Sequence, residues 1–68
     1  MEKIKIDGEF IKLDSLLKFA GLVETGGHAK IEILGGSVLV NNEICLQRGR
    51  KIKSGDKVSF NGQEIVVE

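Results

Sequence analysis

GGSVLVNNEICLQRGRK, residues 35 to 51, is the stretch that decides the fold predicted by this sequence. Its first two glycines end a helix, because glycine enters the left-handed backbone region without a side-chain penalty. Residues 37 to 40 then alternate as a strand does, and Asn41-Asn42 provides a tight turn whose residues tolerate positive φ. Residues 43 to 46 return as a second strand that leads into a basic cluster. We therefore expect a helix end, a hairpin tip and a cationic loop to lie close together.

The N-terminal residues predict a strand upstream of this stretch. Residues 3 to 6 alternate lysine with isoleucine, and Asp7-Gly8 is a strong two-residue turn signal. Residues 9 to 12 can return as a short partner strand, so we expect a terminal hairpin or an edge strand. The aromatic residues fall in strand or helix patterns and are expected in the core: Phe10, Phe19 and Phe60.

Two short helices are predicted between this strand and the central hairpin. Residues 13 to 20 place leucine or alanine at i, i+3, i+4 and i+7, which is the apolar stripe of a helix, and Gly21 ends it. Thr25 is the expected N-cap of the second helix, which runs over residues 26 to 34. Helices joined by so short a connection are expected to pack on each other and on a sheet.

The C-terminal part of the chain adds two strands. A turn at residues 54 to 56 precedes a strand at residues 58 to 60. Asn61-Gly62 is a primed hairpin turn, and residues 63 to 67 form the last strand. The sequence therefore predicts an α+β fold, with two short packed helices beside a small, curled, mostly antiparallel sheet. At 68 residues we expect one domain over residues 1 to 68, which is a monomer.

The composition argues against several classes of function. No apolar run approaches the ~20 residues that span a bilayer, and no signal-peptide core follows Met1, so we expect a cytoplasmic protein without a membrane partner. With one histidine and one cysteine, no catalytic triad or metal-ligand set can be assembled. We expect no enzyme activity, no cofactor, no metal and no small-molecule substrate. Cys45 is interpreted as a buried, inert core residue.

Charge is segregated along the chain although the formal net charge is zero. Residues 47 to 57 hold five cations against one acid, a local charge of +4, whereas residues 1 to 46 and residues 58 to 68 each sum to −2. A basic stretch within a neutral domain predicts a patch for a polyanion, and RNA is the partner we expect.

Two groups of residues are candidates for binding RNA phosphates. In the second helix, Gly26 and Gly27 leave N–H groups unshielded near Lys30, at an end where the helix dipole favours an anion. In the basic stretch, guanidinium groups bind phosphate oxygens bidentately. Some of these residues also have interpretations without RNA. The stretch from Arg48 to Lys51 can be a solvated surface loop, His28 an incidental surface residue, and Asn41 a residue that serves only the turn. The predicted RNA-binding residues are Lys12, Lys18, Gly26, Gly27, His28, Lys30, Asn41, Arg48, Arg50, Lys51 and Lys53.

The order of these parts resembles a known family. LDSLLKFAGL, TGGHAKIEILGG, SVLVNNE and RGRKIKSGDKVSF, within residues 11 to 60, are similar to the RNA-binding domain named after the fourth small-subunit ribosomal protein. They resemble its small stand-alone YaaA-type bacterial members more closely. The resemblance implies a two-helix-plus-hairpin (alpha-L) motif that grips structured RNA, expected to be ribosomal RNA, and a role in ribosome assembly. Larger members carry an arginine or polar residue at the position of Gly26 and a glycine at that of Asn42. These differences favour recognition of the RNA backbone and shape over base-specific contacts from the second helix.

Two other hypotheses compete with RNA binding. A protein-interaction adaptor on the ribosome or another ribonucleoprotein can use Ile31, Leu34 and the sheet edge. A small β-grasp sulfur carrier is weakly suggested by GDKVSF, but the chain ends Val66-Val67-Glu68, whereas such carriers end in two glycines. Reading of single-stranded bases is disfavoured, because the aromatic residues are expected in the core and not beside the basic residues.

Overall fold

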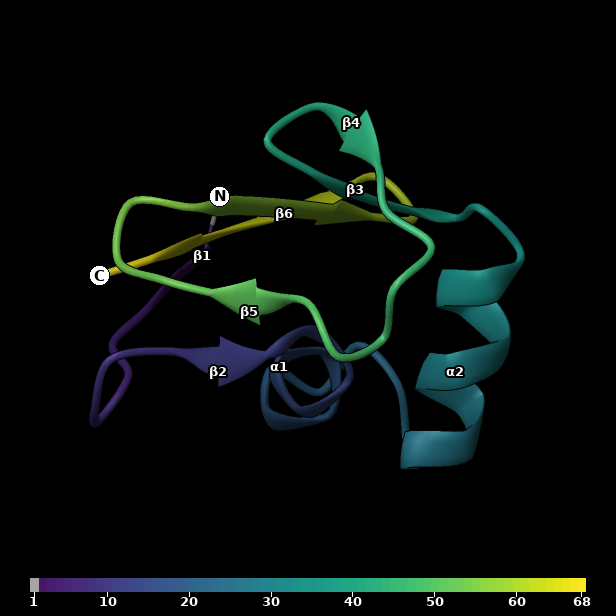
Figure 1. The fold of residues 1–68 in the computed structure, drawn as a ribbon, viewed down its shortest axis with the longest axis horizontal. Coiled ribbons are helices and arrows are strands. Elements are labelled where there is room, and N and C mark those ends of the chain that lie inside the picture. Colours follow the sequence, from purple (N-terminus) through teal and green to yellow (C-terminus); the bar gives the residue numbers. More distant parts are fainter. Residues whose placement is uncertain (1) are drawn as a thin grey trace.

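The computed structural model describes residues 2–68, which fold into a five-stranded sheet, a separate two-stranded ribbon and two helices (Figure 1). The strand order in the large sheet is β1-β7-β6-β3-β4, and the ribbon pairs β2 with β5. Both helices and the ribbon lie on one side of the large sheet (Figure 1). The elements are β1 (Glu2–Ile4), β2 (Ile11–Lys12), α1 (Leu13–Phe19), α2 (Gly26–Leu34), β3 (Val38–Val40), β4 (Glu43–Ile44), β5 (Lys51–Ile52), β6 (Lys57–Phe60) and β7 (Gln63–Val67).

Both helices end as their glycines predict. After α1, Gly21 has a φ of 76°, and the N–H groups of Gly21 and Leu22 donate to the carbonyls of Lys18 and Leu17 at 3.0 Å each. After α2, Gly36 has a φ of 82° and makes the equivalent bond to Ile33 at 3.1 Å. This glycine-ended cap satisfies carbonyls that a helix otherwise leaves unpaired. Figure 1 shows α1 end-on and α2 in the plane of the picture, so the two helices cross steeply.

The core lies between the large sheet and the helices and is aliphatic, as predicted. Fully buried leucines of α1 and isoleucines of α2 and the ribbon pack against the inward-facing residues of β3, β6 and β7. Cys45 is buried, as expected, and its thiol donates to the carbonyl of Gln47 at 3.6 Å. The alternation of buried and half-buried residues along β3, β6 and β7 leaves one face of the sheet toward the core.

The predicted hairpin turns are confirmed by backbone angles in the left-handed region. Asn41 and Asn42 have φ values of 52° and 70°, and Asn61 and Gly62 have 52° and 80°. The return strand of the central hairpin is shorter than predicted, because β4 ends at Ile44 and residues 45 and 46 leave the ladder. The sheet is mostly antiparallel, as expected, and β1 adds one parallel pairing.

The predicted terminal hairpin is wrong, whereas the edge strand is confirmed. β1 pairs in parallel with β7 and so lies at the edge of the large sheet, while β2 pairs with β5 in the ribbon. The pairing follows burial, since Ile4 enters the core beside β7. Residues 5 to 10 therefore carry the chain from one sheet to the other, and Gly8, with a φ of 117°, bends this crossing segment.

Two of the three aromatic residues are not in the core. Phe60 is 6% exposed, as predicted, but Phe10 is 38% and Phe19 is 68% exposed. Phe19 lies two residues beyond Leu17, and therefore on the opposite side of a helix whose inward stripe is filled by leucines. Phe10 lies just before β2, on the outer face of the ribbon.

Candidate nucleic-acid interface

The ribbon places two predicted RNA-binding lysines directly opposite each other. Ile11 pairs with Ile52 and Lys12 pairs with Lys51. Ile52 is fully buried and Ile11 packs on the core, so the two lysines project outward, where both are exposed. Like charges directly opposite on neighbouring strands destabilise a sheet. This pair therefore costs the isolated protein free energy that a bound polyanion would return.

The outer face of the ribbon extends in both directions along the strands. Lys53 follows buried Ile52 and is exposed, like Lys51 before it. The ammonium nitrogen of Lys51 lies 4.9 Å from the centre of the Phe10 ring, a cation–π contact. We call the exposed side chains Phe10, Lys12, Lys51 and Lys53 the ribbon face. The structure thus groups three of the predicted lysines with an aromatic ring that the sequence had assigned to the core.

The arginine loop is fixed to the start of α1 through its backbone. The carbonyl of Arg50 accepts from the N–H of Leu13 at 2.9 Å, and the carbonyl of Arg48 accepts from that of Asp14 at 3.1 Å. These bonds pair the first N–H groups of α1, whose N-cap residue, Lys12, makes no side-chain cap. The backbone of the loop is therefore held next to the ribbon, while both arginines remain exposed.

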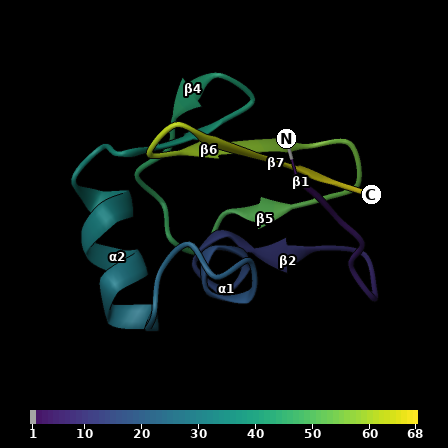
Figure 2. The same ribbon diagram turned by 180° about the vertical axis from the view of Figure 1, so that it is seen from behind.

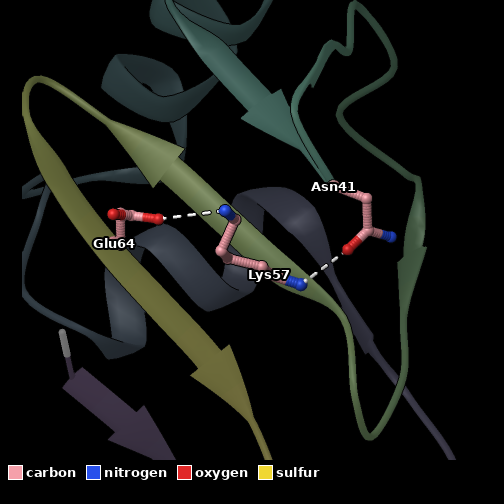
Figure 3. Close-up of polar contacts among 3 residues, drawn as sticks. All are labelled: Asn41, Lys57 and Glu64. Carbon is pink, nitrogen blue, oxygen red and sulfur yellow. Dashed lines mark hydrogen bonds and ion pairs between the residues drawn. The ribbon is translucent and has the colours of Figure 1, made fainter.

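Asn41, another predicted RNA-binding residue, already makes hydrogen bonds within the fold. Its Oδ1 accepts from the backbone N–H of Lys57 at 2.9 Å (Figure 3), and its Nδ2 donates to Asp56 at 3.1 Å. The ammonium of Lys57 in turn lies 3.1 Å from a carboxylate oxygen of Glu64 (Figure 3). Asn41 thus joins the hairpin tip to β6, and Lys57 is removed from the basic patch by its acidic partner.

Asp56 organises the turn between the ribbon and β6. Its pKa is held below the ordinary value, chiefly by the hydrogen bond that its carboxylate accepts from the backbone N–H of Lys53 at 2.8 Å. Burial opposes this effect, while the bond from Asn41 and the charges of Arg50 and Lys53 add to it. The acid of the basic stretch is therefore a scaffold residue that fixes the turn between Lys53 and β6.

The start of α2 carries the second group of predicted residues. The side chain of Thr25 accepts from the N–H of His28 at 3.0 Å, and its carbonyl accepts from that of Ala29 at 3.1 Å. Within residues 2–68 the N–H groups of Gly26 and Gly27 have no acceptor. A Cβ added at Gly26 would meet no atom within 4 Å, so the fold itself does not require glycine there. His28 and Lys30 are exposed, and Lys18 is exposed in the last turn of α1.

The strands of the ribbon and the first turn of α2 lie on different sides of α1. In Figure 1 and in the reverse view of Figure 2, α1 separates the ribbon from the first turn of α2. The segment between β4 and β5, which carries the arginines, passes between α1 and α2 in both views, and its backbone docks on the start of α1. Lys57–Glu64 is the one ion pair among the described residues, which leaves the predicted lysines and arginines without an acidic partner there. Whether each of them touches RNA stays a prediction.

A surface hollow elsewhere on the protein is lined by acidic residues, in contrast to the basic ribbon face. It has a volume of about 550 Å³ and is lined by Glu2, Gly62, Gln63, Glu64 and Ile65. Its carboxylates disfavour a polyanion. None of the helices in the described part of the chain is long and apolar enough to cross a membrane.

Comparison with known proteins finds a family model described as the S4 domain, which matches residues 4–68. RlbA of Bacillus subtilis strain 168, named as a probable ribosome maturation protein, is 44% identical over 59 residues, covering 87% of this chain and 83% of RlbA. YbcJ of Escherichia coli strain K12, named as a putative RNA-binding protein, is 39% identical over 57 residues, covering 84% of this chain and 81% of YbcJ.

A solved structure supports the same relationship. The solution structure of YbcJ from Escherichia coli, described as an alfaL motif involved in RNA-binding, superimposes with a TM-score of 0.75 and 34% sequence identity. The match covers 98% of this chain and 86% of that one. The predicted resemblance and the predicted fold class are thereby confirmed.

Proposed function

The chain belongs to the S4 domain family, and from this membership we propose that it binds structured RNA, ribosomal RNA in particular, through the phosphate backbone. An RNA-binding role agrees with the family, with the description of the YbcJ structure and with the names of the relatives. The name of RlbA supports a role in ribosome maturation. We further propose that residues 1 to 68 act as one non-catalytic, monomeric, cytoplasmic module.

The observation that carries the proposal is the uncompensated lysine pair of the ribbon. Lys12 and Lys51 face each other with no acid to separate them, at a position where a lysine and a glutamate would stabilise the ladder. Such an arrangement suits a partner that brings negative charge. The exposed guanidinium groups of Arg48 and Arg50 extend the same positive surface from the adjoining loop.

The spacing of the two basic groups favours folded RNA over a single strand. The strands of the ribbon and the first turn of α2 are separated by α1 (Figure 1). Two phosphate-binding groups on either side of a helix suit two separate backbone segments, as a folded RNA presents. Recognition by backbone and shape is also the usual mode for RNA helices, whose deep major groove side chains cannot read.

Titration of labelled, structured ribosomal RNA fragments at two salt concentrations tests the proposal. If roughly four to six phosphates are contacted, log K should fall against log salt with a slope on the order of −3 to −5. Simultaneous Arg48→Glu, Arg50→Glu and Lys51→Glu substitutions should weaken all RNAs alike, because phosphate contacts carry no sequence information. Lys3→Glu, a single charge reversal on the exposed side of β1, is the control for the position of the charge change and is compared with Lys51→Glu alone. Absence of binding at low salt ends the proposal, and binding that survives the triple change moves the site elsewhere.

A protein-interaction adaptor is the second candidate, because apolar side chains are exposed on α2 and after β3. The exposed residues are Ile31, Leu34, Ile44 and Leu46. Gly36, which follows α2, lies beside Ile44, so these two segments are neighbours. A pull-down with and without RNase separates the candidates. A partner that is retained after RNase and no longer binds the Ile31→Ser, Leu34→Ser variant supports the adaptor, whereas a partner released by RNase supports RNA binding.

A further inference from the structure

We infer that the pocket between Phe10 and Phe19 receives one unpaired nucleobase of the bound RNA, an inference that rests on the proposed RNA binding. The pocket has a volume of about 220 Å³. It lies beside the ribbon and is lined by Lys5, Ile6, Asp7, Phe10, Ile11 and Phe19. Two phenylalanines that the fold leaves 38% and 68% exposed thus share one small hollow.

The exposure of Phe19 has no explanation in the stability of the protein. Phe19 contributes little to the core at 68% exposure, since apolar burial stabilises a fold in proportion to the area removed from water. Aromatic faces that are open to solvent beside cations are the arrangement that proteins use to stack nucleobases. The Phe19 ring is therefore available to a partner, and Phe10 lines the same pocket.

The size and the polar lining of the pocket favour a base over other occupants. At about 220 Å³ it is smaller than the roughly 300–1,000 Å³ of pockets that hold drug-sized ligands, so a single ring system fits its scale. The carboxylate of Asp7 disfavours a phosphate inside and can accept a hydrogen bond from a base N–H or amino group. The ammonium of Lys5 can donate to a base carbonyl or ring nitrogen.

The pocket is continuous with the positive surface that we propose for the RNA backbone. Lys51 places its ammonium 4.9 Å from the centre of the Phe10 ring, so one residue belongs to both the ribbon face and the rim of the pocket. Lys18 is the neighbour of Phe19 in α1 and is also exposed. A nucleotide whose base enters the pocket can thus keep its phosphate against Lys51 while the rest of the RNA follows the ribbon.

Affinity measurements on phenylalanine variants test the inference with the ribosomal RNA fragment that the intact chain binds best. Phe19→Ala and Phe10→Ala should each weaken binding about 5- to 10-fold, near the lower end of the range for removal of one stacked base. The slope of log K against log salt should stay unchanged, because the same phosphates remain bound. Leu34→Ala removes an exposed apolar side chain on α2 and should leave the affinity unchanged. Circular dichroism of each variant checks that the helices are retained.

Ultraviolet crosslinking of the unmodified protein to the same RNA gives a second readout that needs no variant. We expect nucleotide adducts on Phe10 or Phe19 and none on Phe60, which is buried. Unchanged affinity of both phenylalanine variants, with adducts only at other residues, overturns the base pocket while RNA binding stands, and leaves the pocket to a protein partner. If the unmodified chain binds no structured RNA, the proposed function itself fails.

Discussion

Lys57 on the large sheet and the pair Lys12 and Lys51 on the ribbon have different neighbours. On the large sheet, Lys57 of β6 pairs with Glu64 of β7 at 3.1 Å, and its backbone is tied to Asn41 (Figure 3). On the ribbon, Lys12 of β2 faces Lys51 of β5, with no acidic partner in residues 2–68. The first lysine is part of the scaffold. The ribbon pair opposes the pairing of its own strands, which agrees with the RNA partner that we propose.

The largest expected effect is on RNA affinity when the ribbon pair is reversed. Lys12→Glu with Lys51→Glu should weaken binding on the order of 100-fold, since each charged hydrogen bond is worth about 1.5–3 kcal/mol. The salt slope should become shallower by about one for each phosphate that the variant no longer binds. Fluorescence anisotropy at two salt concentrations measures both quantities. A decrease in affinity of less than about 3-fold would mean that the ribbon pair does not touch RNA.

A smaller effect is expected at the start of α2, where binding and stability should change in opposite directions. Gly27→Ala should stabilise the fold by up to about 1 kcal/mol, because glycine is flexible in the unfolded chain and an added Cβ has its nearest contact 3.8 Å away, at Thr25. The same Cβ should hinder a phosphate at the unpaired N–H groups and weaken RNA binding about 3- to 10-fold. Urea unfolding and RNA titration check the two effects. Unchanged RNA affinity removes this turn from the interface.

Substitution of Lys57 should affect stability more than RNA affinity, whereas substitution of the ribbon lysines should mainly affect RNA affinity. Lys57→Gln should reduce the free energy of unfolding by no more than about 1 kcal/mol, because the ion pair with Glu64 lies at the surface and is partly solvated. RNA affinity should change less than about 2-fold, because this lysine already has an acidic partner. Chemical denaturation and RNA titration of the same preparation test both statements. A large decrease in RNA affinity of this variant would contradict the assignment of Lys57 to the scaffold and of Lys12 and Lys51 to RNA binding.

The smallest expected effect is the contribution of Asp56 to stability, and it should depend on pH. Because the pKa of Asp56 is lowered in the folded chain, its carboxylate stabilises the fold above the ordinary value of 3.8. That stability is lost as the pH falls through the lowered pKa of the folded state. Urea unfolding from neutral to strongly acidic pH should show Asp56→Asn to be less stable than the unmodified chain at neutral pH, with a difference that shrinks below pH 3.8. A difference that is constant with pH contradicts this assignment.

Features that depend on neighbouring residues could be predicted from the sequence. Gly21, Thr25 and the glycines at 35 and 36 act within one helical turn, so both helix ends agree with the structure. The asparagine turns are equally local. The α+β class followed from these signals and from the alternation of the strands.

Features that depend on distant pairing could not be predicted. β1 pairs with β7 from the other end of the chain, and no local signal reveals that choice. The sequence could nominate Lys12 and Lys51 separately, but only the β2–β5 register shows that they face each other. Phe10 and Phe19 were expected in the core because they fall in a strand pattern and a helix pattern, and only the packing of α1 and the ribbon shows that they are exposed.

The central claim is that Lys12 and Lys51 bind RNA and lower the stability of the free protein. Lys12→Glu tests this claim most directly. This substitution places an acid opposite Lys51 and beside the start of α1, so the free energy of unfolding should rise by about 0.5–1.5 kcal/mol. RNA affinity of the same variant should fall about 10-fold or more. A more stable protein with weaker RNA binding is the predicted result. A variant that binds RNA as tightly as the unmodified chain would contradict the claim.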